Sequence, residues 1–385
     1  MSDRFDIVIL GLSVTSSWGN GHATTYRSLI RGLAARGHKI LFLERDAYWY
    51  AENRDEPEPR GAVTLIYTGV EELFADYARF VRDAEFVIVG SYVPDGILIG
   101  EWVTSIAGGR AAFYDIDTPV TLEKLAAGTC DYISPALIPR YDAYLSFTGG
   151  PTLAQIEDVY GAPMARPLYC SVDPADYRPM EVPKRWDLGY LGTYSDDRQP
   201  IVEALMLEPA RRWPEGRFNV TGPKYPAGIA WPQNVDREIH LAPREHPAFY
   251  GAQRFTLNVT REAMKSAGYS PSVRLFEAGA CAAPVISDWW PGLDEFFAID
   301  KEVLVADDPE DTLRYLRNTP ERTRQAIGLA ARERVLARHT PAQRALEIES
   351  YVKEMNGRPR RPKRSEGEAR KAAATMDPVV NRAAE

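Results

Sequence analysis

Short apolar runs alternate with amphipathic stretches along most of the chain. Phe5–Leu10 predicts a buried strand, and Thr24–Arg36 predicts a helix because its apolar residues recur at helical spacing. Gly37 ends that helix, and Lys39–Leu43 is typical of the next strand. The same patterns predict further strands at Glu85–Val89, Ala111–Asp115, Ala143–Phe147, Asp187–Leu191, Arg217–Val220, Phe255–Val259, Ala283–Ser287 and Glu302–Val305, and further helices at Pro200–Leu207, Val273–Ala280 and Pro309–Asn318.

This alternation predicts an α/β fold with parallel sheets that helices cover on both faces. The 385 residues exceed the roughly 250–300 that one core usually supports, so we expect two Rossmann-like domains. The proline-rich segment Pro167–Pro183 is typical of a linker between them. We therefore predict an N-terminal domain over 1–178, a C-terminal domain over 179–340, a final helix over 341–356 and a disordered tail over 357–385.

Composition and charge narrow the class of protein. Hydrophobic residues make up 45% of the chain, which is ordinary for a globular protein. The formal net charge of −8 argues against a protein that mainly binds nucleic acid. The scattered cysteines Cys130, Cys170 and Cys281 have no metal-type spacing. The pattern contains neither a signal peptide nor an apolar run of membrane-spanning length, so we expect a cytoplasmic protein without a transmembrane segment.

A glycine-rich loop follows the first predicted strand. Gly19 and Gly21 let the backbone approach a ligand, and His22 at the start of the next helix is a candidate base. The alternative is a loop that only reverses the chain. A dinucleotide site with Glu44 as its acidic residue is a weaker interpretation, because Thr24 stands where the third glycine belongs.

Two carboxylates follow the strand Ala111–Asp115. Asp115 and Asp117 have the side chains to orient an acceptor hydroxyl, to take its proton or to hold a cation, and we favour the acceptor roles over the metal role. The alternative for Asp117 is a cap on the helix that begins near Pro119.

Polar loops also follow the strands of the second half. Thr193, Ser195 and Arg198 form a candidate pyrophosphate site, because arginine binds phosphate oxygens through a planar fork; the alternative is a polar turn. Gly222 lies in a loop that either walls a base pocket or simply turns. His246 is a weak candidate, since such a histidine more often satisfies a local hydrogen bond.

The segment 270–288, Ser-Pro-Ser-Val-Arg-Leu-Phe-Glu-Ala-Gly-Ala-Cys-Ala-Ala-Pro-Val-Ile-Ser-Asp, carries the most specific signal. Ser272 is placed to cap a helix, and Arg274 lies in its first turn, where a cation is unfavourable unless an anion is bound. Glu277 follows one turn later, so its carboxylate is placed to accept from the two hydroxyls of a ribose. The alternative for Glu277 is an ordinary helix glutamate.

This segment resembles glycosyltransferases of the GT-B fold, and specifically the CgeB-like (spore maturation protein) group. The resemblance extends over nearly all of the chain from about residue 5 to residue 352. It is carried by the segments Phe276–Asp288, Gly292–Phe297, Trp18–His22, Tyr114–Pro119, Val172–Pro174 and Gly189–Tyr194.

The resemblance implies two Rossmann-type domains facing each other across a cleft, with the last helix crossing back to the first domain. It also implies a hexosyltransferase-like, metal-independent enzyme without a cofactor. The C-terminal domain would bind a nucleotide-diphosphate sugar, and the N-terminal domain an unidentified acceptor, whether glycan, lipid, protein or small molecule. Glu277 would bind the ribose, and Ser272, Arg274, Arg198 and the Thr193 region would bind the diphosphate.

One position departs from the family pattern. Many retaining relatives carry a second glutamate eight residues before the ribose-binding one, and here that residue is Tyr269. Retention and inversion of the anomeric configuration therefore both stay open. A nucleotide-sugar epimerase or phosphorylase, and a non-catalytic protein that binds nucleotide sugars or glycans, are the alternative functions.

Overall fold

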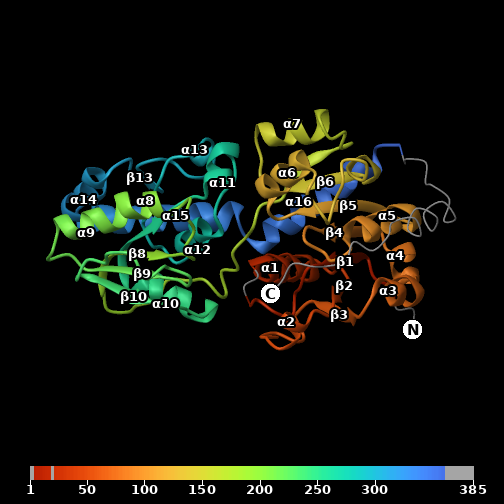
Figure 1. Cartoon of the computed structure of the whole chain (residues 1–385), viewed down its shortest axis with the longest axis horizontal. Helices are drawn as coiled ribbons and strands as arrows, with labels where there is room; N and C mark the ends of the chain where they lie inside the picture. Colours follow the sequence, from red (N-terminus) through yellow and green to blue (C-terminus); the bar gives the residue numbers. More distant parts are fainter. Residues whose placement is uncertain (1–3, 19–20, 360–385) are drawn as a thin grey trace. The chain divides into compact units, whose positions relative to one another are not determined.

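The computed structural model describes residues 4–18 and 21–359, and its internal contacts divide them into two compact units (Figure 1). The first unit comprises residues 4–18, 21–147, 153–168 and 345–359 of this part of the chain. The second comprises residues 148–152 and 169–344. The candidate site residue Gly19 lies outside the described residues, as does most of the predicted tail, residues 360–385.

The first unit is built on a parallel sheet with the strand order β3-β2-β1-β4-β5-β6-β7. Every strand pair recorded in it is parallel, and Ile7 of the central strand lies opposite Ile40 on one side and Phe86 on the other. Apolar side chains such as Val8 and Phe113 are fully buried, which explains why the central strands are continuous apolar runs. The strands are β1 (Ile7–Gly11), β2 (Ile40–Arg45), β3 (Ala62–Tyr67), β4 (Phe86–Gly90), β5 (Arg110–Asp115), β6 (Ala143–Ser146) and β7 (Ala165–Pro167).

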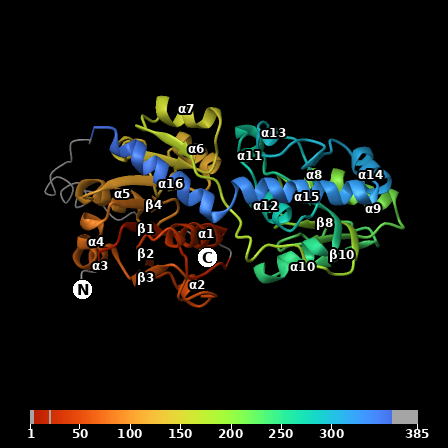
Figure 2. The ribbon, with the colours of Figure 1, turned by 180° about the vertical axis from the view of Figure 1, so that it is seen from behind.

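The last helix of the described chain packs on this first unit. From Ala345 onward α16 belongs to it, and Figure 2 shows this helix in front of the sheet. Glu349 accepts hydrogen bonds from the guanidinium of Arg36, and the Tyr351 hydroxyl donates to the Pro167 carbonyl over 2.8 Å. The helices of the unit are α1 (Gly21–Ala35), α2 (Tyr48–Ala51), α3 (Val70–Asp76), α4 (Ala78–Asp83), α5 (Gly96–Ile106), α6 (Thr118–Ala127), α7 (Pro151–Asp158), which begins in the second unit, and α16 (Pro341–Asn356), together with a 3₁₀ turn at Ile138–Arg140.

The second unit repeats the design with a parallel sheet in the order β10-β9-β8-β11-β12-β13. Its strands are β8 (Trp186–Leu191), β9 (Phe218–Thr221), β10 (Val235–Glu238), β11 (Gln253–Asn258), β12 (Val285–Ser287) and β13 (Leu304–Val305). Its helices are α8 (Gln199–Val202), a π-helical segment at Glu203–Leu207, α9 (Glu208–Arg212), a 3₁₀ turn at Pro243–Glu245, α10 (His246–Gly251), α11 (Glu262–Ala267), α12 (Val273–Ala280), α13 (Leu293–Phe296), α14 (Pro309–Asn318) and α15 (Glu321–Arg338).

Small residues let α12 pack closely in this unit. A Cβ atom added to Gly279 of α12 would lie 2.8 Å from a methyl group of Val335 on α15. A Cβ on Gly328 of α15 would lie 2.2 Å from the Ala282 carbonyl oxygen. The run of small residues after Phe276 therefore sets how deeply α12 sits, and with it the position of the side chains at its start.

The predicted α/β class with two parallel sheets is confirmed. The predicted ends of most strands differ from the observed ones by one or two residues, and Val273–Ala280 and Pro309–Asn318 match exactly. Within the described residues, no helix is both long and apolar enough to cross a membrane.

Candidate functional site

The loop after β1 is fastened by the buried carboxylate of Glu44. One oxygen accepts from the Ser13 and Thr15 hydroxyls over 3.0 and 2.6 Å, and the other accepts from the backbone amides of Val14 and Thr15 over 2.7 and 3.0 Å. Both oxygens of Glu44, the acid of the dinucleotide interpretation, are therefore bonded to the chain itself.

A second carboxylate holds the end of this loop. Asp55 accepts from the amide and hydroxyl of Ser17 and from both terminal nitrogens of Arg27. Burial would raise the pKa of Asp55, but the hydrogen bonds from Arg27 and Ser17 lower it to about 2. The loop is thus fixed by two carboxyl groups, of which Asp55 is ionised at neutral pH.

His22 lies in the first turn of α1, directly after Gly21. Its half-buried ring meets the ring of Tyr92 edge to face, with the centroids 5.4 Å apart. Burial lowers the pKa of His22 to about 4, so the imidazole is neutral at neutral pH and able to accept a proton. A Cβ on the exposed Gly21 would meet nothing, so close backbone packing does not require a glycine there.

Asp115 and Asp117 follow β5 and have different surroundings. Asp115 is fully buried and accepts from the Tyr144 hydroxyl over 2.5 Å and from the Thr121 hydroxyl over 2.8 Å. Burial raises the pKa of Asp115 to about 6. Asp117 is half-buried, and its carboxylate accepts from the Tyr92 hydroxyl over 3.0 Å.

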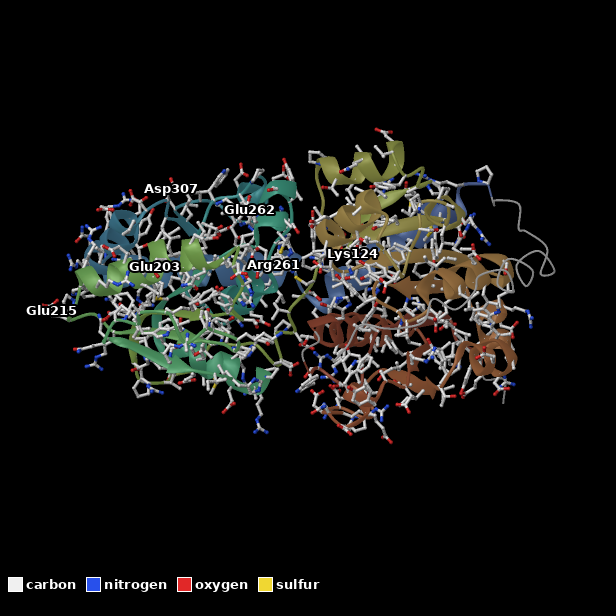
Figure 3. All side chains as sticks on the ribbon, in the orientation of Figure 1. Lys124, Glu203, Glu215, Arg261, Glu262 and Asp307 are labelled. Atoms are coloured by element: carbon white, nitrogen blue, oxygen red, sulfur yellow. The ribbon has the colours of Figure 1, made fainter. Side chains whose placement is uncertain are left out.

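Tyr92 therefore brings two of the predicted residues together, because it contacts the His22 ring and donates to Asp117. Asp117 occupies the N-cap position of α6, but its side chain makes no capping hydrogen bond. The ammonium of Lys124 on α6, labelled in Figure 3, lies 4.9 Å from the centroid of the Tyr92 ring. This partly exposed group therefore combines a neutral imidazole, a carboxylate, a phenol and an ammonium.

In the second unit, the loop after β8 positions Arg198. Its guanidinium donates to the Ser195 hydroxyl over 2.8 Å and to the Thr193 carbonyl over 2.5 Å. Burial lowers the pKa of Arg198, and the positive charges of Arg274 and Arg261 lower it further. Arg261 lies at the start of α11 (Figure 3). These nearby cations create a site that favours an anion.

The loops after β8 and β9 lie against each other at Gly222. A Cβ there would lie 2.0 Å from the Gly192 carbonyl oxygen, and the φ angle of Gly222 is +150°. Both facts require a glycine. The Tyr225 hydroxyl donates to the same carbonyl over 3.2 Å, which joins the two loops.

Helix α12 carries the remaining predicted residues. The Ser272 hydroxyl caps the helix by accepting from the Arg274 amide over 3.4 Å, as the sequence predicts. Within an eight-residue helix, Ser272 and Arg274 stand at the end where the backbone amides and the helix dipole favour an anion.

Glu277 is buried one turn further along α12. Its carboxylate accepts from the Tyr250 hydroxyl over 3.2 Å and lies 3.7 Å from Nδ1 of His246. Burial alone would raise its pKa, but hydrogen bonds from His246 and Tyr177 and the charge of Arg274 lower it. Glu277 is therefore an anion held among donors and is not an exposed helix glutamate.

Tyr269, which departs from the family pattern, has a left-handed backbone with φ +47°. Its amide donates to the Pro291 carbonyl over 2.7 Å, and its carbonyl accepts from the Gly149 amide over 2.9 Å. Cβ atoms at Gly150 and Gly292 would lie 2.2 and 2.6 Å from its ring. The ring thus fills a space that exists because Gly150 and Gly292 have no Cβ atoms.

Residues 198–350 match the model of a family described as glycosyl transferase-like, and this segment contains Arg198, Gly222, Ser272, Arg274 and Glu277. The second unit is therefore similar to this family over residues 198–344. No curated protein sequence matches the chain.

Solved structures with the GT-B fold match about nine-tenths of the chain, which shows that the chain shares this fold. Sucrose-phosphate synthase from Thermosynechococcus elongatus is 15% identical with a TM-score of 0.62, over 91% of this chain and 99% of that one. Alr3699/HepE from Anabaena, in complex with UDP and glucose, is 12% identical with a TM-score of 0.67, over 91% and 100%. An α-glucosyltransferase, in complex with UDP-glucose and DNA containing an abasic site, is 12% identical with a TM-score of 0.70, over 90% and 98%.

Several residues of the candidate site were not predicted from the sequence. Tyr250, Tyr177 and His246 surround Glu277 although they come from separate segments, and only His246 was a candidate. Tyr92 and Tyr144 likewise join the acids of the first unit from distant positions. A tyrosine inside an apolar segment gives no sequence signal that distinguishes a site residue from a core residue.

Proposed function

We propose that this glycosyltransferase transfers a sugar from a nucleoside-diphosphate sugar to an acceptor hydroxyl, with the donor bound by the second unit and the acceptor by the first. The observation that carries the proposal is the start of α12. A neutral hydroxyl cap, Arg274 and the nearby cation Arg198 favour a diphosphate there, and an ionised Glu277 follows one turn later to accept from ribose hydroxyls.

In the proposed reaction, the acceptor oxygen forms a bond to the anomeric carbon while the bond from that carbon to the diphosphate oxygen breaks. The diphosphate leaves with the electron pair, and Arg198, Arg274 and the helix amides stabilise its charge by electrostatic preorganisation. If the configuration inverts, the hydroxyl proton passes to Asp117 or His22. If it is retained, a phosphate oxygen takes the proton. Of the two acids, we assign Asp117 to the acceptor because Asp115 has no exposed surface.

UDP is the first nucleotide to test, because UDP or UDP-glucose is bound in two of the similar structures named above. We also propose that the enzyme belongs to the CgeB-like group and acts in the cytoplasm without a metal or cofactor. The free thiols of Cys130, Cys170 and Cys281 support a reducing compartment.

The test is calorimetry and thermal shift with UDP, GDP, dTDP and CDP and their glucose esters. We expect the nucleotides of one base to raise the melting temperature of the protein. Glu277→Gln and Arg274→Ala should each weaken the affinity for that nucleotide about 100-fold. Glu203→Gln, in a helix of the same unit (Figure 3), is the matched control and should leave affinity unchanged. Unchanged affinity in Glu277→Gln would refute the ribose assignment. Product analysis with donor alone separates transfer from epimerisation, which needs no acceptor.

A further inference from the structure

Exposed aromatic side chains follow two neighbouring strands of the first unit. Tyr48 and Trp49 of α2 follow β2 and are 73% and 44% exposed. Trp18, which is 59% exposed, lies in the loop after β1. Because β1 and β2 are paired and parallel, the segments that follow them leave the sheet at the same edge. We call these three side chains the aromatic platform.

Hydrogen bonds join the two segments that carry the platform. The Trp18 amide donates to the Ser16 hydroxyl over 3.3 Å, and that hydroxyl donates to the Asn53 carbonyl over 2.7 Å. The Asn53 amide group in turn donates to the Trp49 carbonyl over 2.8 Å. The backbones at Trp18 and Trp49 are therefore held in one hydrogen-bonded assembly.

The indole of Trp49 is positioned by its neighbours. Its ring meets those of Tyr48 and Tyr50 edge to face, with centroids 5.1 and 6.0 Å away, and Tyr50 is buried. An ordered aromatic face loses little conformational entropy on binding. Large apolar side chains exposed next to one another mark a binding surface more often than solitary ones do.

The charges around the platform identify the kind of ligand. The two arginines beside it are paired, Arg54 with Asp46 over 2.7 Å and Arg27 with Asp55 over 2.9 Å. Glu52 is exposed in the same segment. The surroundings therefore carry paired cations and a surplus of carboxylate oxygens, which repel anionic lipid and nucleic acid and accept hydrogen bonds from hydroxyl groups.

We propose that the aromatic platform binds a neutral oligosaccharide, which is the acceptor of the transfer reaction. The C–H face of a sugar ring is apolar and stacks on an indole or phenol, and the hydroxyls at its rim donate to the carboxylates nearby. This proposal rests on the proposed function, since it names the chemical class of the acceptor in that reaction.

The experiment measures glycan binding directly, with the full chain on an array of short neutral oligosaccharides and then by calorimetry with the best probe. We expect Trp49→Ala to weaken binding about tenfold and the double variant Trp18→Ala with Trp49→Ala to abolish it. All three side chains are exposed, so the melting temperature should not change, and the affinity for UDP should be intact in every variant.

Trp289→Ala is the matched control, because Trp289 is 42% exposed and lies in the second unit. An equal loss of glycan binding in this variant would overturn the assignment of the platform. Binding to phosphatidylglycerol vesicles and to none of the oligosaccharides would overturn the chemical class of the ligand, as would an absence of binding to every neutral glycan. Since donor binding is measured separately, loss of the nucleotide result would refute the proposed function while leaving the glycan result interpretable.

Discussion

Helices α6 and α12 each begin near the carboxyl edge of a parallel sheet, yet their first turns have opposite electrostatics. At the start of α6 stands Asp117, with Asp115 buried two residues before it. At the start of α12 stand the neutral cap Ser272 and the cation Arg274. A carboxylate at a helix start repels further anions, whereas a hydroxyl and a guanidinium admit them. Under the proposed function, the same fold therefore binds the acceptor hydroxyl at the sheet edge of the first unit and the donor diphosphate at the sheet edge of the second.

The buried acids at the two sheet edges also differ, because their pKa values shift in opposite directions. Asp115 is surrounded by uncharged hydroxyl donors, and burial outweighs them, so its pKa rises to about 6. Glu277 is equally buried, but His246, Tyr177 and Arg274 outweigh burial and lower its pKa. The surroundings of a buried carboxylate thus decide the direction of its pKa shift: upward among uncharged hydroxyls, and downward beside cations and an imidazole.

Among the variants that test this comparison, Asp115→Asn should change the pH dependence of stability the most. The folded state holds the Asp115 proton more tightly than the unfolded state, so stability falls as pH rises from about 4 to about 6. A shift of about two pKa units corresponds to about 3 kcal/mol across this window. In Asp115→Asn this slope should disappear. Urea unfolding of both proteins across the window measures it, and parallel pH profiles would contradict the raised pKa.

Glu277→Gln should give the opposite pH dependence. The lowered pKa of Glu277 means that its ionised form stabilises the fold above the unfolded pKa, and that this contribution is lost as pH falls. The variant loses a charged hydrogen-bond acceptor worth about 2 kcal/mol at neutral pH, and the difference from the wild type should shrink below about pH 4. A difference that grows on acidification would show that Glu277 is not ionised in the native state.

The contrast between centre and edge also explains how much of the fold was predictable. The central strands β1, β4 and β5 are uniformly buried apolar runs and were predicted within two residues. Three of the four edge strands, β3, β7 and β10, were missed, and β13 was predicted. Val63 of β3 is half exposed, and β10 has the sequence Val-Asp-Arg-Glu. An edge strand owes its conformation to its pairing with a neighbour, and one sequence segment does not show that pairing.

The site residues divide in a similar way. Ser272, Arg274 and Glu277 were found because the chemistry of a helix start is local: a cap, a charge in the first turn and a side chain one turn on. Among the residues that support the buried acids Glu277 and Asp115, only His246 was a candidate. The tyrosines were not found, because the hydrogen bond from Tyr250 to Glu277 spans 27 positions and that from Tyr144 to Asp115 spans 29. Those partners are set by the order of strands in the sheets, which hydrophobic periodicity does not reveal.

Tyr144→Phe and Tyr250→Phe compare the two acids through their hydroxyl donors. Each change removes one hydrogen bond to a buried carboxyl group and should cost about 1–2 kcal/mol of stability. Only Tyr250→Phe should also weaken donor binding, because only Glu277 is assigned to the ribose. Equal loss of nucleotide affinity in both variants would show that the loss results from a general destabilisation of the protein. Urea unfolding and calorimetry on the same samples distinguish the outcomes.

Ser272 allows the smallest and most specific test, because its hydroxyl has two separable roles. Ser272→Ala removes the cap of α12 and should cost about 1 kcal/mol. Ser272→Asp restores a capping oxygen, so stability should return to about the wild-type value, but it places a carboxylate where the donor diphosphate is proposed to bind. Nucleotide affinity should therefore fall at least tenfold in the aspartate variant while its melting temperature is normal. This variant places a carboxylate at the start of α12, as Asp117 already does at the start of α6. A normal nucleotide affinity in this variant would show that the charge at the helix start does not determine where the diphosphate binds.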